Sequence, residues 1–274
     1  MADYKLFASD LDGTMLNKNS EMSTQNYAAI EKMRQMGVEF IPITGRCLAE
    51  TDQELLKSGI KYIINSNGAS IYNIETKVSH VTHINKSAME QVIKILEDYE
   101  VVVVAHSDNA VLADSTERSQ DYFRAHRMSE SYIKAIYYSS APVDGLRKKL
   151  CTDTPAEMLA LFFKNEKERI ECAKRFENIA HISFTSSIGG NMEVLDKNVS
   201  KGAALKSLAS VLGIKQSEII AAGDNHNDIS MTYTAGLSLA VSGAVAEMKQ
   251  KCDKTICSNN DNVAEYVYEN FINI

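Results

Sequence analysis

A regular alternation of short apolar runs with amphipathic helical patterns constrains the fold of this 274-residue chain most strongly. Residues 5–9 read as a buried strand, and residues 23–36 carry apolar side chains at helical spacing. Further strands are predicted at residues 38–43 and 61–64, with a second helix at residues 49–58 between them. Strand, helix, strand, helix and strand in this order predict right-handed crossovers and a parallel sheet.

The same alternation returns near the C-terminus. The predicted elements are a helix at 200–212, a strand at 218–222, a helix at 228–234, a strand at 237–241 and a last strand at 255–257. Both terminal parts of the chain are therefore expected to contribute to one α/β fold with a parallel sheet.

The middle of the chain has a different order of elements. A helix at residues 87–99 is followed directly by two strands, at 101–105 and 110–113, and such a succession is typical of a hairpin. We therefore predict an inserted α+β domain with its own sheet. The predicted domains are a core of residues 1–83 and 188–274 and an insertion of residues 84–187.

Charge and cysteine content exclude several classes of protein. The chain has 36 acidic residues against 29 lysines and arginines, so nucleic acid is not expected as its partner. Its five cysteines include no C-x-x-C pair, and residues 1–5 do not resemble a signal peptide. Because no apolar run approaches the roughly 20 residues of a membrane span, we expect a cytoplasmic protein without a membrane partner.

Polar residues follow the predicted strands at the point where each strand ends. The segments concerned are 10–14 (DLDGT), 44–46 (TGR), 65–68 (NSNG) and 223–228 (GDNHND), and residues 200–202 (SKG) begin a helix. Ligands of open parallel sheets bind beyond the carboxyl ends of the strands. The fold is therefore expected to bring these segments to one edge of the sheet.

Several carboxylates would meet at this edge. The acidic residues concerned are Asp10, Asp12, Asp224 and Asp228. Like charges in one crevice repel each other, so the group requires a cation, and ligands that are all oxygen favour Mg²⁺ over zinc. Thr44, Lys201 and Asn227 add groups suited to an anion. This combination suits phosphoryl transfer.

Each of these fragments also has an ordinary structural interpretation. A single Asp-x-Asp is commonly a solvated turn, and Lys201 alone could be a charge at a helix terminus. Their order at successive strand ends makes it improbable that all of them have only such ordinary roles.

At these residues the chain resembles the haloacid dehalogenase (HAD) superfamily. Segments 10–14, 43–46, 201–202 and 223–228 are similar to its four motifs, and Asn67-Gly68-Ala69 with the long insertion is similar to its Cof-type phosphatases. The resemblance covers nearly the whole chain and implies a Rossmann-like parallel core with an inserted α+β cap domain.

The resemblance also implies a role for each matching residue. Asp10 would be the nucleophile that forms an aspartyl-phosphate, and Asp12 the general acid and base. Mg²⁺ would be held by Asp10, Asp224 and the backbone carbonyl of Asp12, with Asp228 orienting metal waters or Lys201. The groups implied to bind the phosphoryl oxygens are the backbone after Asp10 (Leu11), Thr44, Gly45, Lys201 and Asn227. Arg46 would face substrate or cap, and His226 occupies a variable position.

These observations leave three functions open. The first is a Mg²⁺-dependent phosphatase that acts on a small phosphorylated metabolite, with sugar phosphates as the expected substrates. The second is a phosphomutase similar to phosphomannomutases. The third is a catalytically silent regulatory protein on the same scaffold, against which the intact acidic residues argue. The sequence does not indicate the oligomeric state or the physiological substrate.

Overall fold

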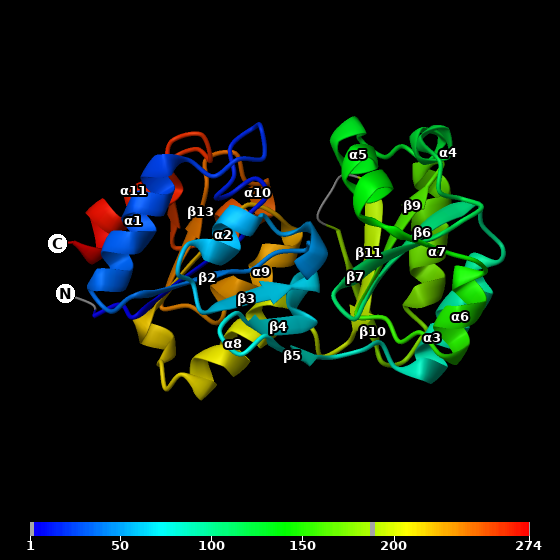
Figure 1. The fold of residues 1–274 in the computed structure, drawn as a ribbon, viewed down its shortest axis with the longest axis horizontal. Helices are drawn as coiled ribbons and strands as arrows, with labels where there is room; N and C mark the ends of the chain where they lie inside the picture. The colour runs from blue at the N-terminus through cyan, green and yellow to red at the C-terminus, as the bar shows by residue number, and fades with distance from the viewer. Residues whose placement is uncertain (1–2, 187–189, 274) are drawn as a thin grey trace. The chain divides into compact units, whose positions relative to one another are not determined.

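The computed structural model describes residues 3–186 and 190–273, which form two compact units. The first unit comprises residues 1–45, 52–80 and 200–274, and the second comprises residues 46–51 and 81–199. Figure 1 labels the elements of both units. None of the helices in the described ranges has the length and apolar character needed to cross a lipid bilayer.

The first unit is built on a parallel sheet whose strands lie in the order β14-β13-β12-β1-β2. These strands are β1 (Leu6–Ser9), β2 (Glu39–Pro42), β12 (Ile219–Gly223), β13 (Leu237–Ala240) and β14 (Lys254–Thr255). Both β2 and β12 pair with β1 in parallel, so Ser9 lies between Pro42 and Ala222. The predicted parallel α/β core is therefore confirmed.

Strand β3 (Tyr62–Asn65) departs from the sequence prediction. The prediction counted residues 61–64 as a third strand of the parallel sheet, but β3 pairs in antiparallel fashion with β4 (Ser70–Asn73). A single parallel bridge, between Ile43 and Ile64, connects it to the segment after β2. The sheet continues from β4 to β5 (Val78–Val81). The cause is a tight reversal directly after β3, at η2 (Ser66–Gly68), where Asn67 and Gly68 both have a positive φ.

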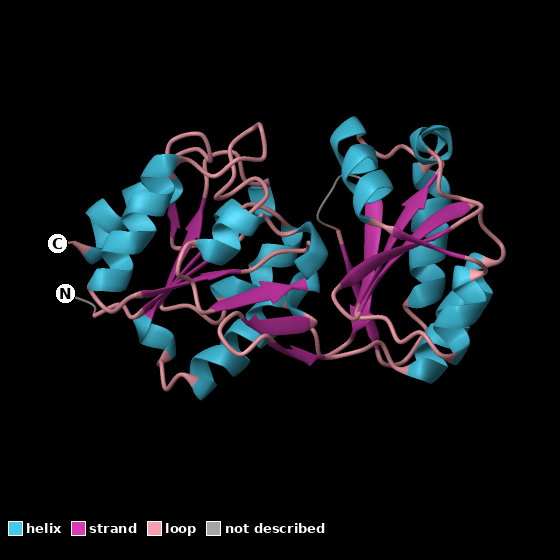
Figure 2. Cartoon of the chain, in the orientation of Figure 1, coloured by secondary structure: helices cyan, strands magenta, loops and turns pink. Residues whose placement is uncertain are grey.

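Helices cover both faces of the parallel sheet (Figure 2). Alternate residues of each strand point to opposite sides, so apolar side chains on both faces must be buried. Phe7 and Ile220 belong to one apolar cluster, whereas Leu6 and Ala8 belong to another. In Figure 1 the N-terminal helix α1 and the C-terminal helix α11 lie side by side. The α-helices of this unit are α1 (Thr24–Gln35), α2 (Gln53–Lys57), α8 (Lys201–Val211), α9 (Ile229–Thr232), α10 (Ala246–Lys251) and α11 (Val263–Val267). Its other helical segments are η2 (Ser66–Gly68), η3 (Gln216–Glu218), η4 (His226–Asp228) and the π-helical η5 (Tyr268–Ile272).

The second unit has its own mixed sheet, in the order β10-β11-β9-β6-β7-β8. Its strands are β6 (Val101–Ser107), β7 (Ala110–Asp114), β8 (Ala141–Val143), β9 (Met158–Phe163), β10 (Ile182–Thr185) and β11 (Asn191–Asp196). The antiparallel hairpin predicted at residues 101–113 is present as β6 and β7. Asp108 and Asn109, both with positive φ, form its turn.

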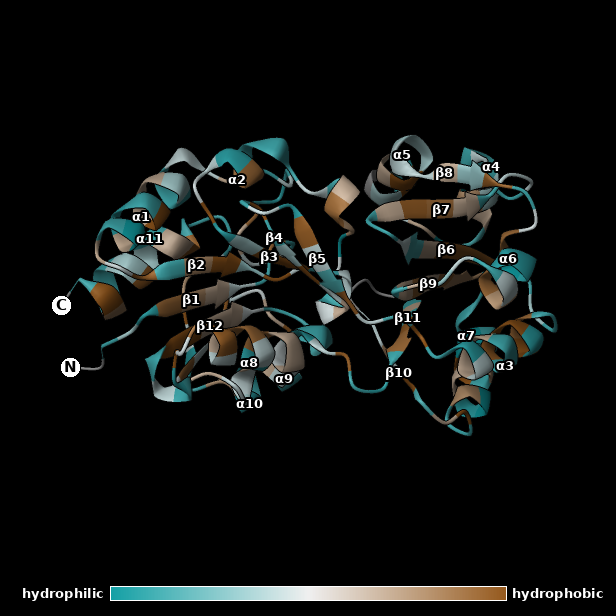
Figure 3. Cartoon of the chain, turned by 60° about the horizontal axis from the view of Figure 1, so that its bottom comes forward, coloured by the Kyte–Doolittle hydropathy of each residue, from teal (hydrophilic) through white to brown (hydrophobic). Residues whose placement is uncertain are grey.

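One face of this sheet packs against α3, α6 and α7, and the other against α4 and α5. The central strands β6 and β9 are accordingly apolar along most of their length (Figure 3). The helices of this unit are α3 (Lys86–Leu96), α4 (Gln120–Ala125), α5 (Glu130–Ser139), α6 (Leu146–Thr152), α7 (Glu166–Phe176) and the 3-10 turn η1 (Leu48–Glu50).

Two segments set the limits of the second unit. The boundary predicted between residues 187 and 188 lies outside the described residues, and β11, which follows it in the sequence, pairs with β9 and β10. Residues 46–51, which follow β2 by a few positions, also belong to the second unit, because Cys47 is fully buried beside Val102 and Phe123.

The second unit also buries a group of ionisable side chains. His106 on β6, Glu157 and Glu193 are each at most 3% exposed. Nε2 of His106 lies 3.7 Å from Oε2 of Glu50. Burial lowers the pKa of His106 to about 4, although Glu157 and Glu193 act in the opposite direction. The imidazole is therefore neutral in the folded protein near pH 7.

Candidate active site

The topology of the parallel sheet brings the chemical groups of the first unit to one edge. Asp10 directly follows β1, Asp224 directly follows β12, and Thr44 lies two residues beyond β2. The backbone N–H of Asp10 donates to the carbonyl oxygen of Ala222 at 3.0 Å, so the ends of the two strands stay in register. This is the edge where the sequence predicted a site.

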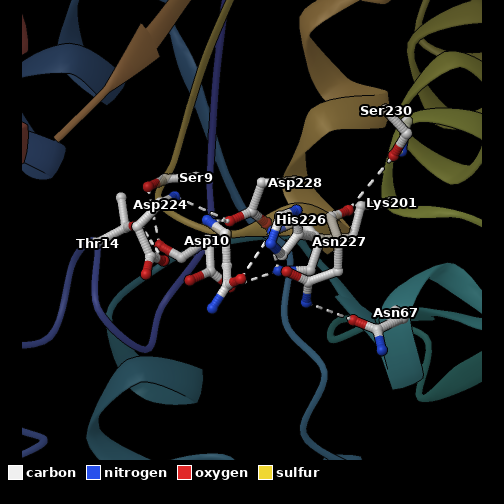
Figure 4. Close-up of polar contacts among 12 residues, drawn as sticks. Ser9, Asp10, Thr14, Asn67, Lys201, Asp224, His226, Asn227, Asp228 and Ser230 are labelled. Atoms are coloured by element: carbon white, nitrogen blue, oxygen red, sulfur yellow. Dashed lines mark hydrogen bonds and ion pairs between the residues drawn. The ribbon is translucent and has the colours of Figure 1, made fainter. Parts of the chain in front are cut away.

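Three carboxylates meet at this edge. Asp10, Asp224 and Asp228 each offer one oxygen, and these oxygens lie within 4.8 Å of one another. Asp10 is 5% exposed and Asp228 is fully buried. Figure 4 shows Asp10, which follows β1, beside Asp224 and Asp228 of the segment that follows β12.

Lys201 supplies a buried positive charge to this group. Its Nζ donates to Oδ1 of Asp10 at 2.5 Å and to Oδ1 of Asp228 at 2.6 Å, and the side chain has no exposed surface. Lys201 is the first residue of α8, where the side chain of Ser200 caps the helix by accepting from the N–H of Ala203. The capped helix start therefore fixes the backbone position from which the side chain of Lys201 extends.

Asp228 is held by hydrogen bonds at both oxygens. While Oδ1 accepts from Lys201, Oδ2 accepts from the backbone N–H groups of Asp224 at 2.9 Å and Asn225 at 3.0 Å. Any Cβ at Gly223 would lie 2.5 Å from Cβ of Asp228, so this close approach requires glycine. Asp228 thus links the loop after β12 to the lysine.

Thr14 and Gly13 position Asp224 from the other side. The hydroxyl of Thr14 donates to Oδ1 of Asp224 at 3.1 Å. Gly13 has a φ of +84°, and a Cβ there would lie 2.6 Å from Oδ2 of Asp224. The turn after Asp10 can therefore approach Asp224 only with glycine at this position.

Burial and mutual repulsion change the acidity of these groups. Burial raises the pKa of Asp10 well above its ordinary value, although Lys201 opposes the rise. Burial and the charge of Asp228 raise the pKa of Asp224 to about 6. Burial alone would lower the pKa of Lys201, but Asp10 and Asp228 more than offset this effect and raise it.

The chemistry of these donors suits a hard divalent cation. All the converging ligand atoms are carboxylate oxygens, which Mg²⁺ and Ca²⁺ prefer. Three ionised carboxylates and one ammonium leave two negative charges, which one divalent cation would balance. The raised pKa values of Asp10 and Asp224 have the same origin, namely buried negative charge that needs compensation.

The residues predicted to bind phosphoryl oxygens lie in the same unit. Thr44 is buried, and its backbone N–H donates to the carbonyl oxygen of Ile64. The side-chain amide of Asn227, in η4, donates through Nδ2 to Oδ1 of Asn67 at 3.0 Å. Leu11 is 2% exposed, and the backbone N–H groups of residues 14–16 fold back onto its carbonyl oxygen.

Three other predicted residues lie outside the carboxylate group. Asp12 is exposed and is not among the three converging carboxylates. Arg46 belongs to the second unit, where its guanidinium donates to the carbonyl oxygen of Glu50 at 3.4 Å. Nδ1 of His226 lies 3.1 Å from Oε2 of Glu247 in an exposed ion pair.

Sequence reasoning assigned no role to Thr14, Asn67 or Ser230. Ser230 accepts through Oγ from the backbone N–H of Gly202 at 2.9 Å and so connects α9 to the start of α8 (Figure 4). Thr14 and Asn67 lie within segments that the sequence had marked as polar strand ends, so their positions were a usable signal. Ser230 follows the last such segment by two residues and had no comparable signal.

Known proteins resemble this chain over almost its entire length. A family model described as haloacid dehalogenase-like hydrolase matches residues 7–267. The phosphatase YwpJ of Bacillus subtilis (strain 168) is 28% identical, with 98% of this chain and 100% of that protein covered. The 5-amino-6-(5-phospho-D-ribitylamino)uracil phosphatase YwtE of the same organism is 27% identical, with 98% of each chain covered.

A solved structure also shares the fold. The haloacid dehalogenase-like hydrolase from B. subtilis superimposes with a TM-score of 0.84 and 25% identity, covering 98% of this chain and all of that one. Fold, strand-end residues and sequence similarity thus point to the same family.

Proposed function

Because this chain belongs to the haloacid dehalogenase-like hydrolases, in their Cof-type branch, we propose that it hydrolyses small phosphate esters through an aspartyl-phosphate on Asp10. Its family and the phosphatase names of its relatives make it a phosphoric monoester hydrolase. We propose sugar phosphates as its substrates. The relative YwtE supports this class, because its name describes a 5-phospho-D-ribityl compound.

One observation carries the proposal: the buried ammonium of Lys201 joins Asp10 to Asp228 at 2.5 and 2.6 Å. A lysine at that place holds the Asp10 carboxylate in one orientation and supplies positive charge where a phosphoryl group must approach. A structural ion pair on the surface would need neither full burial nor two acceptors.

The first step forms one bond and breaks another. A carboxylate oxygen of Asp10 bonds to phosphorus, and the bond from phosphorus to the ester oxygen breaks. Asp12 gives its proton to the departing oxygen, so an alcohol leaves. The exposed position of Asp12 supports this role, since a general acid must exchange protons with solvent and with the leaving group.

The second step reverses the use of Asp12. Its carboxylate takes a proton from a water molecule whose oxygen bonds to phosphorus, while the bond from phosphorus to the Asp10 oxygen breaks. Inorganic phosphate leaves, and Asp10 is regenerated together with the protonated Asp12.

Asp10, Asp224 and the backbone carbonyl of Asp12 would hold Mg²⁺, which when bound supplies positive charge that stabilises the phosphoryl oxygens. Asp228 is assigned to orientation, because Lys201 and two backbone N–H groups already engage its oxygens. Leu11, Thr44, Gly45, Lys201 and Asn227 are proposed to contact the phosphoryl group.

A screen of phosphate release would test the proposal. The panel comprises sugar phosphates, nucleotides and pyridoxal phosphate, each with Mg²⁺ and with a chelator. We expect release from sugar phosphates that stops with chelator. Formation of an isomeric sugar phosphate without phosphate release would instead indicate a phosphomutase, and no conversion of any ester would indicate a silent protein. A small phosphorylated metabolite in the cytoplasm is the corresponding partner.

A further inference from the structure

We propose that Asn67 is a positioning residue that fixes the side-chain amide of Asn227 for contact with the phosphoryl group. The inference rests on the proposed function, in which Asn227 binds a phosphoryl oxygen. Oδ1 of Asn67 accepts from Nδ2 of Asn227 at 3.0 Å, although the two residues are 160 positions apart in the sequence (Figure 4). Asn67 is 1% exposed.

The backbone holds Asn67 in an uncommon conformation. Its φ of 54° and ψ of 27° lie in the left-handed region, which asparagine and glycine tolerate better than other residues. Its N–H donates to the carbonyl oxygen of Thr44 at 3.0 Å. The next residue, Gly68, has a φ of +103°, and a Cβ there would lie 2.4 Å from the carbonyl oxygen of Ser200. The turn is thus fixed against both Thr44 and Ser200.

The side chain of Asn67 also lies against the Thr44–Gly45 segment. A Cβ at Gly45 would lie 3.2 Å from Oδ1 of Asn67, so the glycine gives this amide the room it occupies. One side chain therefore contacts the two segments that are proposed to bind phosphoryl oxygens, the one after β2 and the one after β12.

The chemistry of an amide explains why this contact matters. Nδ2 of Asn227 has two N–H bonds, and the bond given to Asn67 leaves the other for a phosphoryl oxygen. A rotated amide would present its carbonyl oxygen to the anion and repel it. Within residues 3–186 and 190–273, Oδ1 of Asn227 is buried without a hydrogen-bond partner, so the orientation depends on the Nδ2 contact.

The test compares the effect of Asn227→Ala in three backgrounds: the parent, Asn67→Gly and Asn67→Asp. Glycine accepts the φ of Asn67 and removes the side chain, whereas aspartate keeps an oxygen acceptor for Nδ2. The readouts are the Kd of inorganic phosphate by calorimetry and, separately, KM and kcat with p-nitrophenyl phosphate. Lys77→Gly is the matched control, because Lys77 is exposed and also has a positive φ.

We expect Asn67→Gly alone to weaken phosphate binding by about tenfold and to raise KM more than it lowers kcat. Asn227→Ala should weaken phosphate binding by about tenfold in the parent and in Asn67→Asp, but by less than twofold in Asn67→Gly. Comparison within each background cancels the added charge of the aspartate. Lys77→Gly should match the parent, and thermal midpoints report whether each variant is folded.

Equal effects of Asn227→Ala in all three backgrounds would overturn the inference, because Asn67 would then act independently of Asn227. The same holds if Asn67→Gly, folded with the parental thermal midpoint, binds phosphate as the parent does. A parent protein that neither binds phosphate nor hydrolyses any ester would instead overturn the proposed function.

Discussion

Nζ of Lys201 lies 2.5 Å from Oδ1 of Asp10, and neither side chain is more than 7% exposed. Replacing Lys201 by methionine keeps most of the volume but leaves Asp10 and Asp228 without their buried counter-charge. We expect loss of phosphatase activity and a fall of about 3–5 kcal/mol in the free energy of unfolding. Urea denaturation measures the latter.

Two variants control this experiment. Lys206→Met, at an exposed position of the same helix α8, should leave the free energy of unfolding within about 0.5 kcal/mol of the parent. Adding Asp228→Asn to Lys201→Met should recover part of the lost stability, because one unpaired charge is removed. A Lys201→Met variant as stable as the parent would contradict the buried pairing.

Replacement of Asp10 by asparagine tests the nucleophile. We expect no measurable turnover of p-nitrophenyl phosphate and an unchanged far-ultraviolet circular dichroism spectrum, since the amide has the same shape but cannot form the acyl phosphate. Asp108→Asn, at an exposed turn of the second unit, should keep parental activity. Parental turnover in Asp10→Asn would remove Asp10 from its assigned role.

The leaving group should decide how much Asp12→Ala costs. With p-nitrophenyl phosphate, whose leaving group needs little protonation, we expect a small loss of kcat/KM, and with a sugar phosphate a loss of about 10²–10⁴-fold. The ratio of the two losses is the measurement. Equal losses with both esters would refute the role of general acid.

Removal of metal should affect stability as well as activity. A cation that binds only the folded protein stabilises it by about 2.7 kcal/mol at a concentration 100-fold above its Kd. Calorimetric scans should therefore show a higher thermal midpoint with Mg²⁺ in the parent and in Asp108→Asn. Asp224→Asn should show a much smaller rise, because one of the three converging carboxylates is lost. A full Mg²⁺-dependent rise in that variant would exclude Asp224 as a ligand.

His106 should make stability depend on pH. Its pKa is about 4 in the folded protein, below the ordinary value of 6.5, so the unfolded chain binds a proton first as pH falls. The free energy of unfolding should therefore decrease between pH 6.5 and 4, by on the order of 2 kcal/mol at pH 5. Urea midpoints of His106→Gln should lack this part of the decrease, whereas the exposed-site control His80→Gln should keep it. Identical pH profiles for parent and His106→Gln would contradict the burial.

Local patterns were sufficient to predict the parallel core and the edge where the polar segments meet. Short apolar runs followed at once by acidic or hydroxyl residues specify both a strand and the point where it ends, as at Asp10 and Asp224. The structure brings these groups together, while the catalytic role of each residue stays a prediction. The contact of Ser230 with Gly202 carries no local pattern, because it depends on how separate segments pack.

The errors in the fold prediction have identifiable causes. An apolar run such as residues 61–64 does not reveal its partner, although the turn signal Asn67-Gly68 marks the reversal that pairs β3 with β4. β11 was not predicted as a strand. It carries Asn191 and Glu193 at buried positions, so the pattern of polar and apolar residues did not mark it as part of a buried sheet. The helix predicted at 49–58 is divided because Asp52 caps a new start at α2.

The burial of Cys47 limits how small this enzyme can be made. Its thiol packs among apolar residues contributed by segments far along the chain, including Val104 on β6 and Phe123 on α4. A shortened gene that joined residue 80 to residue 200 would still encode the loop at 46–51. In its product, Cys47 would lose the apolar side chains that cover it and would be exposed to water. A minimal version of this protein would therefore need that loop redesigned, not merely the insertion excised.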